Sequence, residues 1–299
     1  MSKLGFKPID APHRHLLIDG DVFAFTAASA VQKIHIDTFG IAQPFAHSQE
    51  GEGVISNMIL SVKELLNADS IEVVLTSSTN WRHSVYPEYK GGRKEPFPGA
   101  YRPLLLGHLK QYLRDNFGAY DVEGLEADDV LGIKSTETGH GQERIIVSRD
   151  KDFKTIPGKY HRMGDLDLNR NPVILESTQW EATRFHLYQT LKGDAVDGYP
   201  GCPQMGDTRA EEFLKSPTLL RPQKGVITVG KNKGMETTKW VAEPTRDYWA
   251  GIVSHYQKGG QGEAEALCNA RLANILQADQ YDWETKELTL WTPERIRGI

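Results

Sequence analysis

Two short acidic segments constrain this chain more than any other feature of its sequence. They are Glu126-Ala127-Asp128-Asp129 and, about one strand-and-helix unit later, Ser148-Arg149-Asp150-Lys151-Asp152. Each segment lies beside an apolar run, so its carboxylates are expected at the ends of buried elements. Clustered carboxylates repel one another unless a cation lies among them. Oxygen ligands with no Cys or His nearby favour Mg²⁺ or Mn²⁺ over zinc. We therefore expect a metal-dependent enzyme that acts on phosphodiesters.

The overall composition is that of an ordinary soluble protein. The 299 residues include 39% hydrophobic and 25% charged residues, enough for one large α/β domain or a domain with an appendage. No apolar run is long enough for a membrane span, and the N-terminal segment MSKLGFKPIDAPHRH has no apolar signal core. Cys202 and Cys268 match no zinc spacing and fit free thiols in a reducing cytosol. A cytoplasmic location, no membrane partner and a monomeric state are expected.

The net charge of −5 at first argues against a nucleic-acid partner. The proposed metal cluster changes this interpretation, because removing its eight carboxylates leaves 32 of the 40 acidic residues against 35 basic ones. A mildly basic shell around an acidic, metal-filled centre is compatible with phosphate binding. The eight residues are Asp19, Glu126, Asp128, Asp129, Asp150, Asp152, Asp194 and Asp197.

Strand and helix patterns alternate along the first half of the chain, which predicts an α/β fold with a mainly parallel central sheet flanked by helices. Strands are expected at 15–19, 71–76 and 144–148, with 160–163 and 172–175 extending the sheet. Helices are expected at 21–30, 55–66, 101–117, 126–134, 178–191, 206–214, 245–257 and 261–277. The remaining segments are interpreted as a polar connection at 40–53, a basic loop or arch at 77–100, a hairpin at 224–241 and a last short strand at 288–291.

Polar side chains lie within a residue or two of the ends of three predicted strands. They are Asp19, Ser77 and Asp150. Ligands of parallel sheets gather beyond the carboxyl ends of the strands, so these side chains are expected to converge on one site.

Each acidic group taken alone has a simpler explanation. Asp150 or Asp152 could cap a helix, the group at 126–129 could be a charged first turn, and Asp194 and Asp197 could form a turn between glycines. Together the groups supply the six to eight oxygen ligands that two divalent ions about 4 Å apart would need to clamp a phosphodiester. The combination therefore favours a two-metal site.

Several strings along the chain resemble the 5′-nuclease (flap endonuclease) family, most closely its branch from T-seven-like bacteriophages. They are LLIDGD (16–21), NWR (80–82), EYKGGRK (88–94), LEADDV (125–130), SRDKDFKTIP (148–157), LYQTLKGDAVDGYPG (187–201) and GKNKGMETTKWV (230–241). The resemblance runs from about His15 to Trp291. It implies a PIN-like core with a helical arch and a helix–turn–helix clamp on duplex DNA.

The resemblance also implies roles for particular residues. Asp19, Glu126 and Asp128 would hold a first metal, and Asp150, Asp152 and Asp197 a second, with Asp128 bridging. Asp129 and Asp194 would act through water. The arch pair Lys90 and Arg93 would approach the scissile phosphate, and residues 194–214 would grip the duplex, with K⁺ as a possible ion there. Residues expected to contact DNA are Phe25, Arg82, Tyr89, Lys94, Arg209, Lys231 and Lys233.

Three of these assignments have open alternatives, and the chain departs from the family pattern at two places. Trp81, beside Arg82, could instead pack in the core or the arch, and Lys231 and Lys233 could lie in a solvated turn. Ser77 stands where the family's second strand usually supplies a metal-binding Asp. The clamp loop, GCPQMGDTRA, has Asp207 and Thr208 where small and basic residues are usual.

The expected activity is that of a 5′→3′ exodeoxyribonuclease that also cleaves flaps and RNA primers. Its expected partners are duplex DNA with 5′ ends, 5′ flaps and RNA–DNA hybrids, in phage DNA replication, recombination and host DNA degradation. One alternative is a branched-DNA-binding protein that cuts weakly because of Ser77. A metal phosphatase that starts from LLIDGD is another, but it has no use for a basic arch. The expected domains are a nuclease core at 1–176, with its arch, and a clamp region at 177–299 packed on it as one unit.

Overall fold

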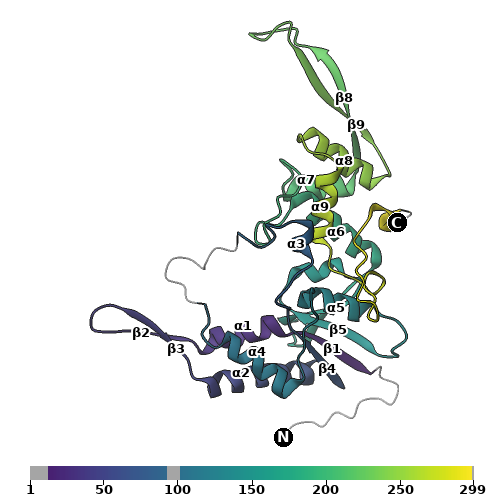
Figure 1. Cartoon of the computed structure of the whole chain (residues 1–299). Helices are drawn as coiled ribbons and strands as arrows, with labels where there is room; N and C mark the ends of the chain where they lie inside the picture. Colours follow the sequence, from purple (N-terminus) through teal and green to yellow (C-terminus); the bar gives the residue numbers. More distant parts are fainter. Residues whose placement is uncertain (1–12, 93–101, 298–299) are drawn as a thin grey trace. The chain divides into compact units, whose positions relative to one another are not determined.

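The computed structural model describes residues 13–92 and 102–297, which form two compact units (Figure 1). The first unit comprises residues up to Asn80, Glu95–Gln179 and Ile275–Thr289. The second comprises Trp81–Lys94, Trp180–Asn274 and Leu290 onward. The chain thus crosses from one unit to the other at more places than a single boundary near 177. The packing of the predicted clamp region on the core stays a prediction. No helix in the described ranges is both long and apolar enough to cross a membrane.

A five-stranded sheet forms the centre of the first unit, in the order β4-β1-β5-β6-β7. Its strands are β1 (Arg14–Asp19), β4 (Ser70–Val74), β5 (Glu143–Ser148), β6 (Gly158–Leu166) and β7 (Pro172–Ser177). Neighbouring strands are parallel except for β6 and β7, which are antiparallel. Ile18 on β1 pairs with Val73 on β4 and with Val147 on β5. The mainly parallel sheet that the alternating pattern predicts is confirmed.

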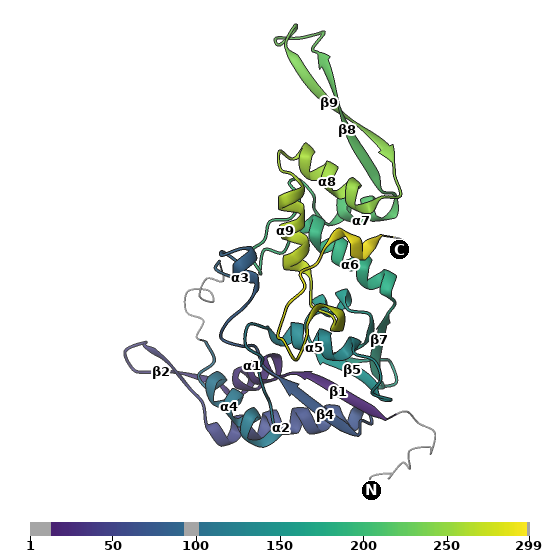
Figure 2. The same cartoon turned by 45° about the vertical axis from the view of Figure 1, so that its right-hand side comes forward.

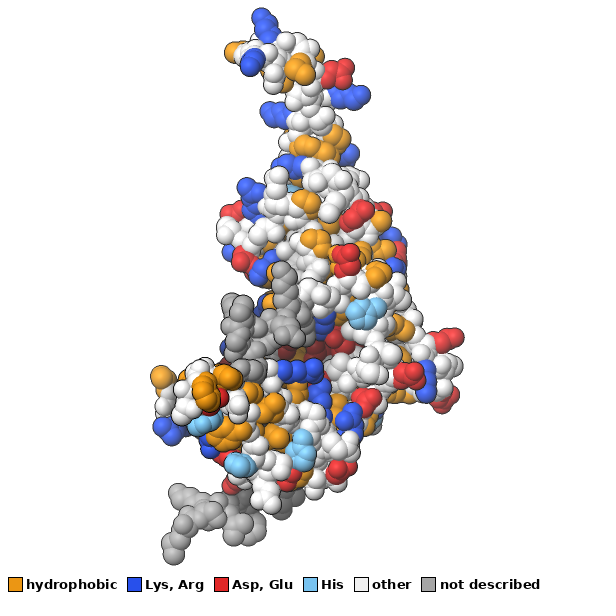
Figure 3. Space-filling view, turned by 60° about the vertical axis from the view of Figure 1, so that its left-hand side comes forward, with side chains coloured by type: hydrophobic (Ala, Val, Ile, Leu, Met, Phe, Trp, Pro, Cys, Tyr) orange, Lys and Arg blue, Asp and Glu red, His pale blue; other side chains and the backbone are white. Residues whose placement is uncertain are grey.

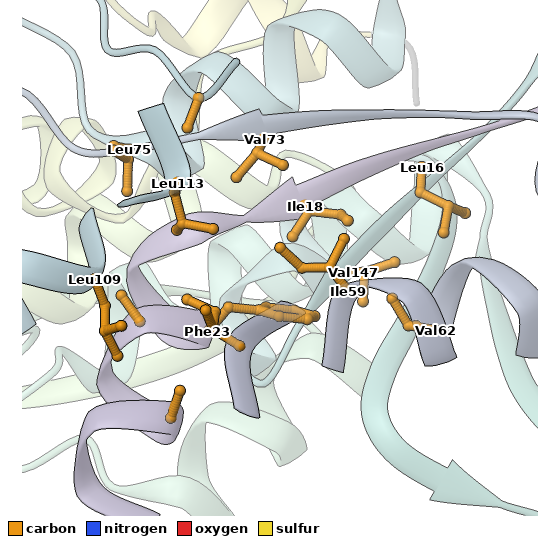
Figure 4. Close-up of a cluster of buried hydrophobic side chains, with 14 of the residues drawn as sticks. Leu16, Ile18, Phe23, Ile59, Val62, Val73, Leu75, Leu109, Leu113 and Val147 are labelled. Atoms are coloured by element: carbon orange, nitrogen blue, oxygen red, sulfur yellow. The ribbon is translucent and has the colours of Figure 1, made fainter. Parts of the chain in front are cut away.

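Helices pack against the parallel part of this sheet (Figure 2). They are α1 (Gly20–Val31), α2 (Ser48–Leu65), α4 (Leu106–Phe117) and α5 (Ala127–Thr136). Leu16 and Ile18 of β1, two residues apart, share a face and join the core formed with α1, α2 and α4 (Figure 4). Leu17 points to the other face and is also fully buried. Burial on both faces explains why the sequence of β1 contains an uninterrupted apolar run.

The junction between β1 and α1 depends on a capping residue and a glycine. Oδ1 of Asp19 accepts a hydrogen bond from the Val22 N–H at 3.1 Å and so caps the helix. A Cβ at Gly20 would lie 2.8 Å from the Val74 carbonyl oxygen and 2.9 Å from Leu75 Cδ2. Only glycine therefore allows α1 to begin this close to β4.

The predicted polar connection at 40–53 is wrong. The segment contains β3 (Ala42–Phe45), which pairs with β2 (Lys33–Ile36) as an antiparallel hairpin, and the start of α2 at Ser48. The sequence pattern did not predict this ribbon because its apolar residues, such as Ile36 and Phe39, are exposed and do not form a buried strand.

The second unit is mainly helical. Its elements are α3 (Arg82–Val85), α6 (Gln179–Lys192), α7 (Asp207–Lys215), α8 (Tyr248–Lys258), α9 (Glu263–Ala273), a 3₁₀ turn (Pro293–Ile296) and the antiparallel pair β8 (Thr218–Val226) and β9 (Glu236–Pro244). Its core includes Leu187, Phe213, Ile252, Tyr256 and Ala270. The hairpin expected at 224–241 is present and is longer than predicted.

The strand expected at 288–291 is wrong: in the described chain, Leu288 forms only an isolated bridge with Tyr281, and Pro293 begins a 3₁₀ turn. In the predicted arch, 77–92 contains the four-residue helix α3, and the rest of the arch, 93–100, lies outside the described residues.

Candidate active site

The carboxyl ends of two adjacent strands bring Asp19 and Ser148 together. Asp19 ends β1, Ser148 ends β5, and the Ser148 hydroxyl donates a hydrogen bond to Oδ2 of Asp19 at 2.7 Å. The Asp150 N–H donates to the same serine oxygen at 3.1 Å, and the Asp152 N–H donates to Oδ1 of Asp150 at 2.8 Å. The loop after β5 is thereby bent around the end of β1.

Asp19 is an unfavourable place for an isolated charge. Its side chain is 3% exposed. Burial, with smaller contributions from the nearby Asp21 and Asp150 carboxylates, raises the pKa of Asp19 to about 7 despite the hydrogen bonds from Ser148 and Val22. A divalent cation would remove this penalty by compensating the buried charge. The donor set, which consists of carboxylates and a hydroxyl, fits a hard ion such as Mg²⁺ or Mn²⁺.

The start of α5 is fixed against the end of β4. The Ala127 N–H donates to Thr76 Oγ1 at 3.1 Å, and the Ser77 N–H donates to the Leu125 carbonyl at 3.1 Å. These bonds place Ser77 beside the buried Glu126, at the same edge of the sheet as Asp19. The edge position expected for Ser77 is therefore the one that the structure shows.

Asp128 and Asp129 face different surroundings. Asp128 is half-buried, whereas Asp129 is completely buried. The Asp129 carboxylate accepts hydrogen bonds from the Glu126 N–H at 3.4 Å and from the Leu276 N–H at 3.2 Å. These contacts give Asp129 a positioning role, in which it holds the first turn of α5, and its water-mediated metal role stays a prediction.

Asp21 belongs to this edge, although sequence reasoning gave it no role. Its Oδ2 accepts a hydrogen bond from the Thr76 N–H at 2.8 Å, and its Oδ1 lies 2.6 Å from Lys110 Nζ on α4. Asp21 thus connects the first turn of α1 to the end of β4 and to α4. The spacing of Asp19 and Asp21 in LLIDGD was the signal that could have revealed it.

In the second unit, Asp197 lies beside the described part of the predicted arch. Its Oδ2 accepts a hydrogen bond from the Tyr89 hydroxyl at 3.1 Å, and its Oδ1 lies 3.8 Å from Lys90 Nζ. The Lys90 N–H also donates to the Asp197 carbonyl at 2.8 Å. An acidic and a basic residue with predicted roles are thus fixed together within one unit.

Asp194 forms the turn that presents Asp197. Its Oδ1 accepts hydrogen bonds from the Val196 N–H at 2.8 Å and from the Asp197 N–H at 3.3 Å. This contact is the turn-forming alternative considered from the sequence, and it gives Asp194 a local structural role. A direct or water-mediated metal role for Asp194 stays a prediction.

The structure corrects the predicted DNA contacts of Arg82 and Tyr89, because both side chains are only 2% exposed. The Arg82 guanidinium donates to the carbonyls of Leu272 at 3.3 Å and Asn274 at 2.7 Å. It also lies over the rings of Trp81 and Tyr89. Arg82 therefore anchors α3 to the end of α9.

The other predicted DNA contacts differ in accessibility. Phe25 is 52% exposed on α1, and both lysines of the β8–β9 turn, Lys231 and Lys233, are exposed. Arg209 donates to the Gln204 carbonyl at 2.8 Å within the predicted clamp loop. The unusual Asp207 of that loop lies 2.7 Å from Lys192 Nζ and accepts a hydrogen bond from Tyr188. Arg93 and Lys94 lie outside the described residues.

The carboxylates do not form a closed cage in either unit. Among residues 13–92 and 102–297, no three His, Cys, Asp or Glu side chains lie close enough together to make a ready metal site. The order of the strands and the contacts of Asp19 still place Asp19, Glu126, Asp128, Asp150 and Asp152 at one edge of the first unit.

Comparison with known proteins agrees with this arrangement. A model of the family described as "5'-3' exonuclease, N-terminal resolvase-like domain" matches residues 14–177. The chain is also 35% identical over 288 residues to an exodeoxyribonuclease of Enterobacteria phage T3, with 93% of this chain and 92% of the relative covered. The chain belongs to the 5′-3′ exonuclease family. Within that family, it is 35% identical to an exonuclease of Escherichia phage T7, with 93% of each chain covered.

This exonuclease-family chain has further relatives. It is 31% identical over 212 residues to a flap endonuclease of Shewanella woodyi, with 67% of this chain and 76% of the relative covered. A solved structure of the phage T5 5′-exonuclease with bound zinc covers 88% of this chain and is itself covered to 90%, with a TM-score of 0.56 at 15% identity. The structural likeness confirms the predicted PIN-like α/β fold.

Proposed function

We propose that this member of the 5′-3′ exonuclease family is a 5′→3′ exodeoxyribonuclease that hydrolyses DNA phosphodiesters with two divalent ions, Mg²⁺ or Mn²⁺. The observation that carries the proposal is the buried Asp19 carboxylate, whose charge is opposed by burial and by Asp21 and Asp150. A purely structural acid in this position would be costly. A carboxylate that holds a cation needs this kind of low-dielectric, acidic site.

The residues at the sheet edge have distinct proposed roles. Asp19, Glu126 and Asp128 would hold the first ion, and Asp150 and Asp152 would contribute to the second. When bound, the ions would supply an activated water and stabilise the negative charge that develops on the phosphate. Ser148 would hold the Asp19 carboxylate in a fixed orientation, and Asp129 would hold the first turn of α5.

For residues of the second unit, we propose the roles that the family resemblance implies. Lys90 would neutralise a non-bridging phosphate oxygen, with Arg93 as its partner, and Asp197 would complete the second ion's ligands. Residues 194–214, which end in α7, would form the helix–turn–helix that grips duplex backbone, with K⁺ as a possible ion there. Support comes from the close placement of Lys90 and Asp197 and from the tight turn around Asp194.

The range of proposed substrates is duplex DNA with 5′ ends, 5′ flaps and RNA–DNA hybrids, handled by a monomer in the host cytoplasm. The proposed biological roles are phage DNA replication, recombination and degradation of host DNA. They are supported by the likeness to exonucleases of phages T3 and T7 over nearly the whole chain.

Asp150→Asn tests the proposed chemistry. The variant should lose most Mg²⁺-dependent cleavage of a 5′-labelled duplex but keep duplex binding, because the metal clamp and the phosphate grip are separate. Glu64→Gln, which removes one charge from the exposed side of α2, is the matched control and should cleave as wild type does. Cleavage by Asp150→Asn at the wild-type rate would exclude a catalytic role for this edge of the sheet.

The alternative function, a branched-DNA-binding protein with weak cleavage, is favoured by one observation. Ser77 lies beside Glu126 through the bond of its N–H to Leu125, at the place where the family usually supplies a carboxylate. Release of mononucleotides from a 5′-labelled duplex in Mg²⁺ would support the exonuclease. Tight binding of a branched substrate without such release would support the alternative.

A further inference from the structure

The longest exposed element of the second unit is the ribbon formed by β8 and β9, here called the arm (Thr218–Pro244). Its two strands pair continuously from Thr218 with Pro244 to Val226 with Glu236 (Figure 2). Leu220 is buried at its base, whereas residues 221–239 are exposed except for the half-buried Ile227. A two-stranded hairpin exposed on both faces is only marginally stable in water. A binding partner would account for its retention.

The charge of the arm indicates the kind of partner. The arm carries five basic and two acidic residues, an excess of three positive charges in a chain whose net charge is −5. Arg221 pairs with Glu243 at 2.9 Å. In the described ranges, the other four basic side chains have no ion pair; they are Lys224, Lys231, Lys233 and Lys239. Basic side chains are visible along the arm in Figure 3. This charge favours a polyanion over a neutral or basic protein surface.

The lysines are distributed over both faces of the arm. Residues paired across an antiparallel ribbon lie on the same face. Lys239, paired with Gln223, lies on one face, and Lys224, paired with Thr238, lies on the opposite face. A ribbon that rested flat on a charged surface would need lysines on one face only. Lysines on both faces suit an element that lies between two rows of phosphates, which is the geometry of a DNA groove.

The dimensions of the arm agree with this interpretation. A strand of nine residues is about 30 Å long, and the two strands lie about 5 Å apart. The major groove of B-form DNA is about 12 Å wide and admits a two-stranded ribbon. Two apolar residues near the turn, Val229 and Met235, are 81% and 59% exposed. Such side chains suit contact with base edges, where methyl groups of thymine are accessible.

The base of the arm continues into the predicted clamp. Trp240 of β9 lines a groove of about 730 Å³ together with Gln204 and Arg209 of the clamp loop and Lys258 at the end of α8. Arg209 and Lys258 thus line a groove that reaches the base of the arm, and the acidic Glu212 lines the same groove.

We propose that the arm lies in the major groove of duplex DNA and keeps the enzyme on its substrate between successive cuts. This inference rests on the proposed function and adds a duplex-holding element outside the metal site. The arm makes no contribution to the cleavage step itself.

A shortened arm provides the main test. Lys224 and Thr238 face each other across the ribbon, so Gly225–Thr237 can be replaced by Asn-Gly, which closes a two-residue hairpin turn. The shortened variant should bind a 30-base-pair duplex roughly tenfold more weakly at 0.15 M salt, with a salt slope smaller by about 2, because two lysines are removed. It should release fewer nucleotides per binding event in the presence of an excess of unlabelled DNA. Its cleavage rate at saturating DNA should equal that of wild type.

A second pair of variants separates the effect of the lysine charges from the effect of removing the ribbon. Lys231→Gln/Lys233→Gln removes both turn lysines, and Lys63→Gln/Lys286→Gln removes two lysines of the first unit as a matched control. The first double variant should reproduce the loss of salt dependence and of nucleotides per binding event, and the control should not. Thermal unfolding of all variants should match that of wild type.

Two results would overturn the proposal, and both differ from a failure of the proposed function. Unchanged duplex affinity and unchanged nucleotides per binding event in the shortened variant would exclude DNA as the partner of the arm, as expected if the arm binds a protein. A lower cleavage rate at saturating DNA would instead place the arm in the catalytic machinery. If wild type itself releases no nucleotides in Mg²⁺, the proposed function fails, while the salt dependence of duplex binding still tests the arm.

Discussion

The hydroxyl of Ser148 donates a 2.7 Å hydrogen bond to Oδ2 of Asp19, which joins the carboxyl ends of two adjacent parallel strands. The same oxygen accepts the Asp150 N–H. One buried serine therefore orients a proposed ligand from β1 and the loop that carries two proposed ligands after β5.

Ser148→Ala should reduce the apparent affinity for Mg²⁺ in cleavage more than it reduces the affinity for DNA. Loss of a hydrogen bond that orients a metal ligand typically costs 10- to 100-fold in metal affinity or activity, so we expect the Mg²⁺ concentration for half-maximal cleavage to rise about tenfold. Ser148→Thr keeps the hydroxyl and should restore most of the wild-type dependence. If Ser148→Ala and wild type have the same Mg²⁺ dependence, the serine serves packing alone.

Ser77→Asp should lower the Mg²⁺ concentration needed for half-maximal activity, because a carboxylate brings a full charge where a hydroxyl is a weak neutral ligand. In chelator the same change should slightly lower the thermal midpoint, since it adds a charge to an acidic cluster. Ser78→Asp adds the same charge at an exposed neighbour and is the control. An unchanged metal dependence in Ser77→Asp would show that residue 77 does not face the first ion.

Lys90→Ala should slow the chemical step more than it weakens duplex binding. Its ammonium group lies 3.8 Å from Asp197 and is proposed to act on the reacting phosphate, where an interaction gained only in the transition state raises the rate. Single-turnover rates at saturating DNA, compared with equilibrium binding, separate the two effects. Equal losses in both measurements would make Lys90 an ordinary backbone contact.

Gly193→Ala should destabilise the second unit severely. Gly193 has a φ of +75°, and a Cβ there would lie 2.4 Å from the Pro200 carbonyl carbon. Gly139→Ala is the matched control, because its φ is +87° but no atom lies within 4 Å of the added Cβ. The control should lose about 1 kcal/mol from left-handed backbone strain, and Gly193→Ala at least about 2 kcal/mol more. Chemical denaturation measures the difference, and equal losses would contradict the proposed steric conflict.

His186 should make the fold sensitive to acid. Burial lowers its pKa from 6.5 to about 4, and its Nε2 is hydrogen bonded to the Ala270 carbonyl. The unfolded chain therefore takes up a proton before the folded chain does, and stability is lost as the pH falls from about 6.5 to 4. The loss from this one group should reach about 2–3 kcal/mol at pH 4.

The matched variants for this prediction are His186→Gln and His35→Gln. Glutamine cannot take up a proton, so His186→Gln should flatten the decline of unfolding free energy between pH 6.5 and 4. The same change at the exposed His35 should leave the decline as in wild type. Equal slopes in all three proteins would mean that the pKa of His186 is the same in the folded and the unfolded chain.

The sequence was most informative where burial and periodicity agree. The apolar run that ends at Asp19 predicts a central strand, since β1 is buried on both faces, and the clustered carboxylates predict the edge at which Asp19, Glu126 and Asp150 lie. The β2–β3 hairpin could not be predicted in this way because its apolar residues, such as Phe39, are exposed. Propensity alone did not reveal that residues 289–297, the last ones that the structure describes, form no strand.

The roles of single charged residues were harder to predict, because they depend on contacts distant in the sequence. Arg82 looked like a DNA contact, but carbonyls of Leu272 and Asn274 some 190 residues later bind its guanidinium. Asp129 was predicted to act on a metal through water, but its bond from the Leu276 N–H, 147 residues later, could not be predicted. Asp21 received no role, although it joins α1 to β4 and α4.

The alternation of faces along the β8–β9 arm limits how its length can change during evolution. Removing one paired residue from each strand, such as Gln223 and Lys239, would exchange the two faces of everything beyond the deletion, so Lys224 would move to the face opposite Trp240. Removing two residues from each strand preserves the faces and shortens the reach by about 7 Å. Related nucleases with such a ribbon should therefore differ in arm length by steps of four residues. The distance that the arm extends from the second unit should change in steps and not continuously.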